Sequence, residues 1–139
     1  IDMERVQDLI GCPEWHDTYR GTQRCVPTEY GDVVLARKEL PSSYHLAVVV
    51  DDAAQGVTHV TRGEDLFDAT HIHRALQGVL GLPTPEYMHH ALLRDNEGKR
   101  LAKRDGARSL LSLRQAGYTP QQVMDSLRAA LQNGGIWVC

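Results

Sequence analysis

The spacing of apolar positions changes along the chain and separates strand-like from helix-like segments. Residues 57–61 alternate apolar and polar side chains, as a strand with one buried face does. After them the spacing becomes helical, and we expect Asp68 to cap a helix that Gly81 ends. The apolar positions on one face of that helix are Ile72, Leu76, Val79 and Leu80. A strand followed by a helix predicts a βα unit.

Glycine and proline separate the other expected elements of the amino-terminal part. Residues 11–32 contain five of these breakers among polar residues, so we expect loops and short extended pieces there. Residues 32–37 and 87–93 each favour a strand. The run 46–50 is apolar and β-branched, a pattern that fits a strand and a buried helix equally well.

The carboxyl-terminal part of the sequence predicts a small helical subdomain. Residues 95–98 favour a tight turn, and a basic loop follows at 99–104. A short helix is expected from residue 110. Thr119 and Gln122 then form the pattern of a capping box, with a proline at the first helical position between them.

Composition and charge narrow the class of protein. With 139 residues, 42% hydrophobic and 24% charged, the chain resembles a folded globular protein. Its formal charge of -3 excludes a uniformly basic nucleic-acid-binding surface and allows a local basic patch. No apolar run approaches the ~20 residues that span a bilayer, so we expect no membrane association. Three cysteines without metal-ligand spacing predict a reduced, cytoplasmic protein.

Two places carry candidate chemistry. The loop 99–104 holds four Lys and Arg side chains in six residues, which suits a triphosphate or a nucleic-acid backbone and is also typical of a solvated turn. Tyr44 and Arg62 each stand at the edge of a predicted element, so both could face one cleft. Arg62 offers a planar fork for a carboxylate, and the alternative is that it pairs with acidic neighbours at 64 and 65.

The seven histidines predict no metal site. His71 and His73 fall on different sides of the expected helix, and His89 and His90 on opposite faces of the expected strand. Neither pair can therefore hold one ion, and we expect these side chains to be ordinary packing residues.

The order of these motifs resembles the second half of the catalytic core of glutamyl-tRNA synthetase-like class I enzymes. The matching segments are residues 33–38, 43–52 and 56–66, then 81–83, His89 and 99–106, within a resemblance that covers residues 30–116. It implies an α/β fold: the second half of a class I synthetase Rossmann-type core followed by a small helical subdomain. The implied divisions are a connecting segment at 1–32, the half-core with its signature loop at 33–106, and the helical subdomain at 107–139.

Within that group, Leu35-Ala36-Arg37-Lys38 followed by residues 43–47 is more similar to the glutamyl-Q tRNA(Asp) synthetases. This resemblance implies an enzyme that activates glutamate with ATP and Mg²⁺ and transfers it to the queuosine base of tRNA(Asp). One alternative is a fragment of an ordinary glutamyl-tRNA synthetase charging tRNA(Glu). Another is a stand-alone RNA-binding or interaction module that uses the basic loop.

The resemblance also implies roles for single residues. Tyr44 and Arg62 match positions that hold glutamate, with Arg62 pairing with a carboxylate. The residues implied to bind ATP are Leu92, Leu93, Arg100, Lys103 and Arg104. Lys103 is the implied catalytic residue, because it matches the lysine of the second class I signature, usually Lys-Met-Ser-Lys-Ser, that stabilises the pyrophosphate leaving group. Arg100 and Ala102 depart from this signature, which keeps the charge and loses a hydroxyl.

Two features of the family have no match in residues 1–30: the first signature, His-Ile-Gly-His or similar, and the zinc-binding cysteines. Both precede this segment in the family, so we expect the chain to be the carboxyl-terminal half of such an enzyme and inactive alone. The implied partners are tRNA(Asp), L-glutamate, ATP, and either the missing amino-terminal half or a second copy of this chain.

Overall fold

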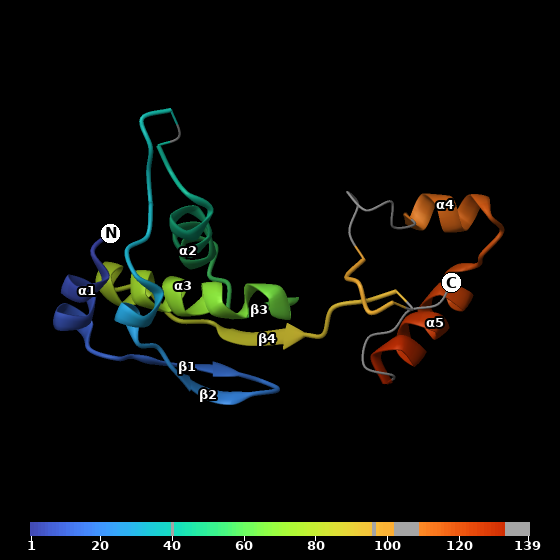
Figure 1. Ribbon diagram of the computed structural model, residues 1–139, viewed down its shortest axis with the longest axis horizontal. Helices are drawn as coiled ribbons and strands as arrows, with labels where there is room; N and C mark the ends of the chain where they lie inside the picture. Colours follow the sequence, from blue (N-terminus) through green and yellow to red (C-terminus); the bar gives the residue numbers. More distant parts are fainter. Residues whose placement is uncertain (40, 96, 102–108, 133–139) are drawn as a thin grey trace. The chain divides into compact units, whose positions relative to one another are not determined.

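The computed structural model describes residues 1–39, 41–95, 97–101 and 109–132, and the chain folds as two compact units, Ile1–His90 and Ala91–Cys139. The first unit contains a four-stranded sheet in the order β2-β1-β4-β3 (Figure 1). Its strands are β1 (Glu14–Asp17), β2 (Gly21–Arg24), β3 (His59–Gly63) and β4 (Glu86–His90). β1 pairs with β2 antiparallel, whereas β4 is parallel to both β1 and β3.

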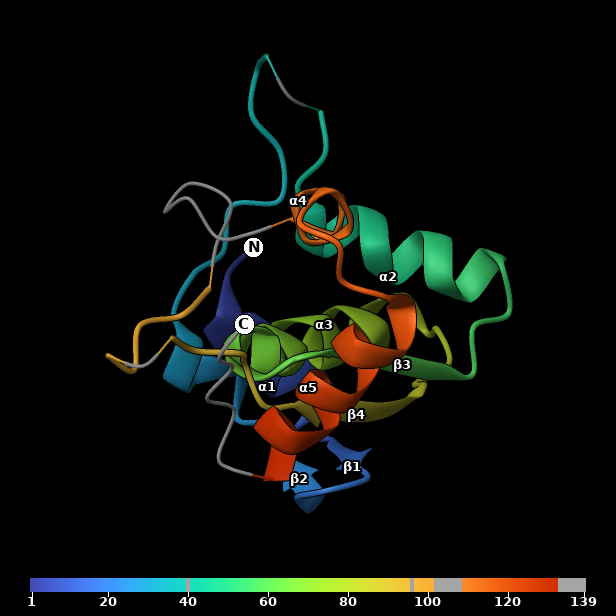
Figure 2. The same cartoon turned by 90° about the vertical axis from the view of Figure 1, so that its right-hand side faces the viewer.

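Three helices accompany this sheet: α1 (Met3–Ile10), α2 (Tyr44–Ala54) and α3 (Phe67–Leu80). α3 packs against α1 and α2 and lies between α2 and the sheet (Figure 1 and Figure 2). Two single-turn 3-10 helices, η1 (Pro27–Tyr30) and η2 (Glu64–Leu66), complete the unit. The segment 1–32 therefore contributes one helix and two strands to the first unit.

The predicted βα unit is confirmed, and it sets the pairing register of β3 and β4. Parallel strands need a crossover, and α3 supplies it between β3 and β4. In the resulting register Arg62 lies directly opposite His89. α3 ends at Gly81 as expected, with φ 65° and ψ 29°. Asp68 does not cap the helix, because α3 begins one residue earlier and Asp68 lies in its first turn, where a negative charge still favours the helix dipole.

The structure resolves one ambiguous run and corrects two strand predictions. The ambiguous run 46–50 is part of helix α2, which Ser43 caps by accepting a hydrogen bond from the backbone N of Leu46 (3.3 Å). Residues 32–37 form no strand: Val33 exchanges backbone hydrogen bonds with Ile1, but no neighbouring strand continues the ladder. The strand expected at 87–93 ends at His90, where its pairing with β3 also ends.

The core of the first unit forms around Trp15, which is 3% exposed. Its ring contacts Phe67 and His71 (centroids 5.2 Å apart in each case) and Tyr87 (5.4 Å), so it joins β1 to α3 and β4. Tilted and edge-on aromatic pairs of this kind add to the stabilisation from buried apolar area. The other buried residues in the cluster around Trp15 are Met3, Val6, Cys25, Ala75 and Tyr87.

The second unit is helical, as predicted, with α4 (Leu110–Gln115) and α5 (Pro120–Gln132). The capping box is confirmed: Thr119 Oγ1 accepts from the backbone N of Gln122 (3.2 Å), and the Gln122 side chain accepts from the backbone N of Thr119 (2.8 Å). The turn at 95–98 is closed by Gly98 N donating to Asp95 O (3.0 Å). Among the residues described, no helix has the length and apolar content of a membrane span.

The left-handed backbone at Gly81 generates a stability prediction. We expect Gly81→Ala to lower the free energy of unfolding by about 1 kcal/mol, because a Cβ is strained at this φ. Gly81→Asn is the matched control and should cost less, since asparagine tolerates this conformation. Urea unfolding followed by circular dichroism measures both, and equal costs would show that left-handed strain is not the cause.

Candidate functional site

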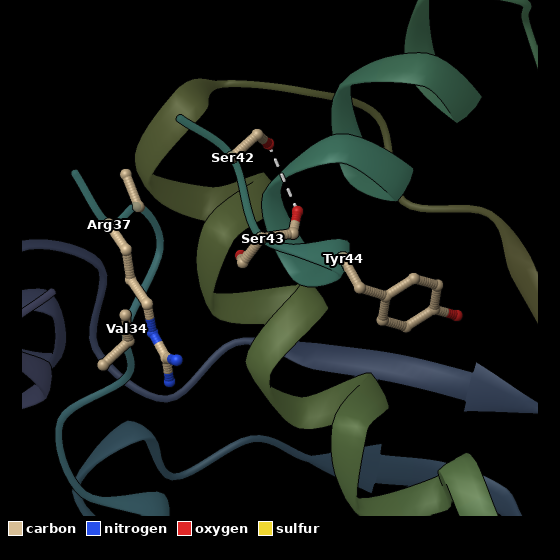
Figure 3. Close-up of a pocket in the computed structure, with 6 residues that line it drawn as sticks. Val34, Arg37, Ser42, Ser43 and Tyr44 are labelled. Atoms are coloured by element: carbon tan, nitrogen blue, oxygen red, sulfur yellow. Dashed lines mark hydrogen bonds between the residues drawn. The ribbon is translucent and has the colours of Figure 1, made fainter. Parts of the chain in front are cut away.

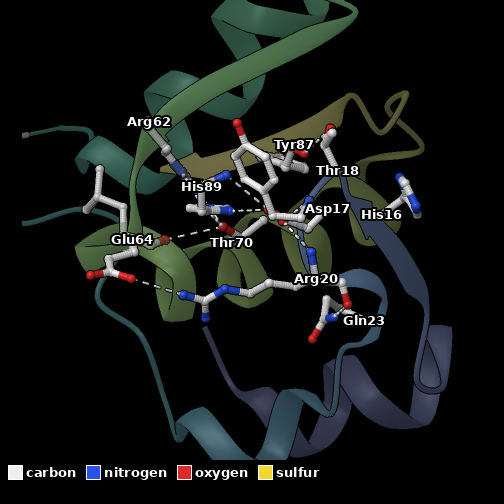
Figure 4. A network of polar contacts seen from close by, with 12 residues as sticks. His16, Asp17, Thr18, Arg20, Gln23, Arg62, Glu64, Thr70, Tyr87 and His89 are labelled. Carbon is white, nitrogen blue, oxygen red and sulfur yellow. Dashed lines mark hydrogen bonds and ion pairs between the residues drawn. The ribbon is translucent and has the colours of Figure 1, made fainter. Parts of the chain in front are cut away.

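Arg62 is the centre of a polar network between β3, β4 and α3 (Figure 4). Its Nε donates to His89 Nε2 (3.1 Å), and its Nη1 contacts His73 Nδ1 (3.3 Å). Its Nη2 donates to Thr70 Oγ1. The hydroxyl of Thr70 also contacts His89 Nε2 (3.0 Å) and donates to the carbonyl of Leu66 (3.2 Å). The half-buried guanidinium is thus held on three sides.

Asp17 fixes the far side of this network. Its carboxylate is fully buried and accepts from the backbone N and from Nδ1 of His89 (3.1 and 2.7 Å). The other carboxylate oxygen accepts from the backbone N of Tyr19 (2.9 Å) and of Arg20 (3.0 Å), in the turn between β1 and β2. Four donors therefore satisfy a charge that has no contact with solvent.

The directions of the hydrogen bonds that join His89 and His73 to Asp17 and Arg62 follow from the charged groups at the two ends of the network. A carboxylate only accepts, so His89 carries its proton on Nδ1, and its bare Nε2 accepts from Arg62. An arginine only donates, so His73 accepts at Nδ1 and carries its proton on Nε2. That proton points at His45 Nδ1, 3.1 Å away. One carboxylate and one guanidinium thereby assign the tautomers of three histidines.

Burial keeps these imidazoles neutral. It lowers the pKa of His73 to about 3, and the charge of Arg62 acts in the same direction. Burial and Arg62 likewise lower the pKa of His45. For His89, burial lowers the pKa and outweighs the opposing hydrogen bond to Asp17. Burial alone would raise the pKa of Asp17, but its hydrogen bonds from His89 and from backbone N–H groups lower it overall.

This arrangement can bind an anion. Three of the five N–H groups of Arg62 point at His89, His73 and Thr70, which leaves one hydrogen on each terminal nitrogen, as many as a carboxylate has oxygens. Because the surrounding imidazoles are neutral, the positive charge of the cluster belongs to the guanidinium.

Tyr44, the other sequence-derived candidate, lies at the start of α2 and is brought close to this network. Its ring contacts those of His73 (centroids 5.7 Å apart) and His45 (5.6 Å), and it is 53% exposed. Figure 3 shows the ring directed away from the shallow pocket that Val34 and Arg37 line beside the same helix end. Tyr44 and Arg62 are therefore joined through His73.

Glu64, an acidic neighbour of Arg62, has an ion-pair partner of its own. It pairs with Arg20 (Oε2 to Nη2, 3.3 Å; Figure 4). The Arg20 guanidinium also lies 4.2 Å from the centre of the Phe67 ring. The alternative drawn from sequence, in which Arg62 pairs with its acidic neighbours, does not describe the contacts that hold the guanidinium, which run to imidazoles and a hydroxyl.

The residues implied to bind ATP belong to the second unit. The backbone of Leu93 accepts a hydrogen bond from Leu101 N (2.9 Å), and Arg100 forms an antiparallel bridge with Arg94. Leu92 lies just before this bridge. Lys103 and Arg104 lie outside the described residues.

Cys25 packs in the core of the first unit. It is fully buried, and its Sγ donates to the carbonyl of His71 (3.2 Å). Burial raises the pKa of this thiol to about 11. Within the described ranges, no three His, Cys, Asp or Glu side chains are grouped as metal ligands.

Sequence reasoning singled out Arg62 and Tyr44 as candidates and did not identify the residues that hold Arg62. His73 and His89 are buried, as expected, but they bind the guanidinium as well as pack. Asp17 and Thr70 were not singled out. The available signal was weak: Asp17 follows Trp15 by two positions on the buried face of β1, where a charged residue needs a partner.

Comparison with known proteins gives consistent matches. The family model described as tRNA synthetases class I (E and Q), catalytic domain, matches residues 6–132. A glutamyl-Q tRNA(Asp) synthetase of Rhodobacter capsulatus is 61% identical over 127 residues, 88% of this chain and 46% of the relative. A "glutamate--tRNA ligase 2" of Nitrosococcus oceani is 40% identical over 114 residues, 82% of this chain and 24% of the relative.

A solved structure agrees with these sequence matches. It is a glutamate tRNA ligase from Elizabethkingia meningosepticum in complex with its amino acid, with TM-score 0.60 and 33% identity over 70% of this chain and 20% of that one. The chain spans about half the length of the Rhodobacter relative and less of the others.

The lowered histidine pKa values predict how stability depends on pH. Below the unfolded pKa of about 6.5, the unfolded chain binds protons that the folded network excludes, so stability falls as pH drops. For His73, whose folded pKa is about 3, the loss is about 2 kcal/mol between about pH 6.5 and pH 5. Urea unfolding at a series of pH values measures this slope.

His73→Gln should flatten the slope, because glutamine can accept from Arg62 and donate to His45 without titrating. His59→Gln, at an exposed position of β3, is the matched control and should leave the slope unchanged. An equal slope in the His73 variant and the unsubstituted chain would contradict the assignment.

Proposed function

Since the chain belongs to the class I (E and Q) tRNA synthetase catalytic-domain family, we propose that it forms part of an enzyme that activates glutamate with ATP and transfers it to the queuosine base of tRNA(Asp). The support for this branch is the 61% identity to a relative named glutamyl-Q tRNA(Asp) synthetase, against 40% to one named glutamate--tRNA ligase. The proposal includes a cytoplasmic enzyme, whose cysteines stay reduced.

The observation that carries the proposal is the environment of Arg62. Its guanidinium is held by neutral acceptors and keeps one N–H on each terminal nitrogen for an anion. A carboxylate of glutamate has the charge and the two oxygens to use them. Tyr44 lies on the other side of His73, where its partly exposed phenol can contact the same substrate.

The proposed reaction has two steps, activation of glutamate and its transfer to tRNA. In the activation step, a carboxylate oxygen of glutamate attacks the α-phosphorus of ATP, and pyrophosphate leaves. In the transfer step, a hydroxyl of the queuosine base attacks the activated carbonyl carbon, loses its proton, and AMP leaves. Arg62 contributes by holding glutamate in place, which converts part of the binding energy into orientation.

The ATP side of the proposal rests on the family resemblance. We assign Leu92 and Leu93 to the adenine, Arg100 and Arg104 to the phosphates, and Lys103 to the pyrophosphate leaving group. Mg²⁺ accompanies ATP in this proposal, where it would neutralise phosphate charge. Cations near the leaving group matter most in the transition state, where its negative charge increases.

An ordinary glutamyl-tRNA synthetase is the second candidate, supported by the match to the Nitrosococcus ligase. Labelled glutamate separates the two, since the proposed enzyme transfers it to queuosine-containing tRNA(Asp). Transfer to tRNA(Glu), with none to tRNA(Asp), would select the second candidate.

We predict that Arg62→Ala in the full-length enzyme raises the glutamate concentration needed for ATP–pyrophosphate exchange. The loss of a charge-assisted fork in a partly desolvated site costs about 2 to 4 kcal/mol, or about 30-fold or more in the requirement. Arg5→Ala, at an exposed position of α1, is the control. Unchanged glutamate dependence would remove Arg62 from the substrate site.

Lys103→Ala should act on rate more than on glutamate binding, because its charge is needed when pyrophosphate leaves. We expect a loss of about ten-fold in exchange rate, since Arg100 and Arg104 supply neighbouring charge. Steady-state exchange kinetics separate turnover from the glutamate constant. A change confined to the glutamate constant would contradict a role in activation.

A further inference from the structure

The position of Arg62 is determined by a chain of contacts that begins far from it. Backbone N–H groups of Tyr19 and Arg20 fix the carboxylate of Asp17, which receives the Nδ1 proton of His89. The other nitrogen of His89 then accepts from Arg62. The Asp17 and His89 side chains are both fully buried, so neither can take another orientation without breaking these bonds.

The contact between His89 and Arg62 depends on the tautomer of His89. With its proton on Nε2, His89 would direct an N–H at the N–H of Arg62, and the two donors would repel. Asp17 excludes that tautomer because its carboxylate, 2.7 Å from Nδ1, needs the proton there. Asp17 therefore acts on Arg62 without touching it.

A fixed guanidinium is useful at a carboxylate site. Arginine has a long side chain with many rotamers, and ordering it on binding would weaken affinity. Here the guanidinium is held by His89, Thr70 and His73, with Nε, Nη1 and Nη2 each engaged by a protein acceptor. The remaining hydrogens are thereby presented in a set plane.

We propose that Asp17 and His89 are positioning residues for the substrate carboxylate: Asp17 selects the Nδ1-protonated tautomer of His89, and His89 orients Arg62. This inference rests on the proposed function, in which Arg62 binds glutamate. It assigns a role in substrate recognition to a carboxylate at the end of β1 that is fully buried and held by the β1–β2 turn.

Two amide substitutions at position 89 test the proposal in the full-length enzyme. His89→Gln places an amide near the former Nε2, where its oxygen can accept from Arg62, whereas His89→Asn places the amide near Nδ1 and leaves Arg62 Nε without that acceptor. We expect His89→Asn to raise the KM for glutamate about ten-fold, and His89→Gln about three-fold or less. The KM for ATP and kcat should change by less than about two-fold in both.

A double-substitution cycle separates positioning from general structural damage. If His89 acts through Arg62, adding His89→Asn to Arg62→Ala should change the glutamate KM by less than about two-fold. Full additivity of the two effects would overturn the proposal. His59→Asn, at an exposed position of β3, controls for loss of an imidazole from the sheet.

The tautomer can be observed without any substitution. ¹⁵N NMR of the histidine-labelled enzyme should show His89 protonated at Nδ1 and bare at Nε2, and a proton on Nε2 would overturn the proposal even if the variants fail to fold. Parallel assays of Arg62→Ala distinguish a failure of the proposed function from a failure of the positioning role. If Arg62→Ala leaves glutamate dependence unchanged, the proposed function fails; if it acts and a folded His89→Asn does not, only the positioning role fails.

Discussion

A carboxylate without access to solvent stays charged only when donors satisfy its lone pairs, and Asp17 meets that condition with four hydrogen bonds. Two of the donors belong to the turn after β1 and two to His89 in β4. The same charge thus fixes the hairpin, its junction with β4 and the side chain of His89. The position of Arg62 depends on the fixed His89 side chain, because His89 Nε2 is the acceptor for Arg62 Nε.

The network also shows how the positive charge of one half-buried arginine is kept available for an anion. Three imidazoles surround Arg62 directly or through one neighbour, and burial keeps all of them neutral. If they were charged, they would repel the guanidinium. As neutral groups, His89 and His73 accept hydrogen bonds from it and leave its charge available. Thr70 completes the cradle from α3, the helix that also sets the register between β3 and β4.

The sequence allowed part of this to be predicted. Alternation at 57–61 and the helical spacing after it located β3 and α3, because both patterns are local. Helix α2 could not be assigned from its β-branched run; the cap at Ser43 and packing against α3 decide it. Arg62 was identified from its place at a strand end, but Asp17 and His89 meet only through the β1–β4 pairing, which leaves no mark in local spacing.

The contact between Asp17 and His89 joins residues 72 positions apart. Closing a loop of that length carries an entropy cost that the assembled sheet and helices must offset, so this contact depends on the fold of the whole first unit. A chain released from the ribosome before β4 would hold Arg62 without its acceptor. Recognition at Arg62 is therefore a property of the completed topology of the first unit, and partly folded forms of the protein lack it even where β3 is present.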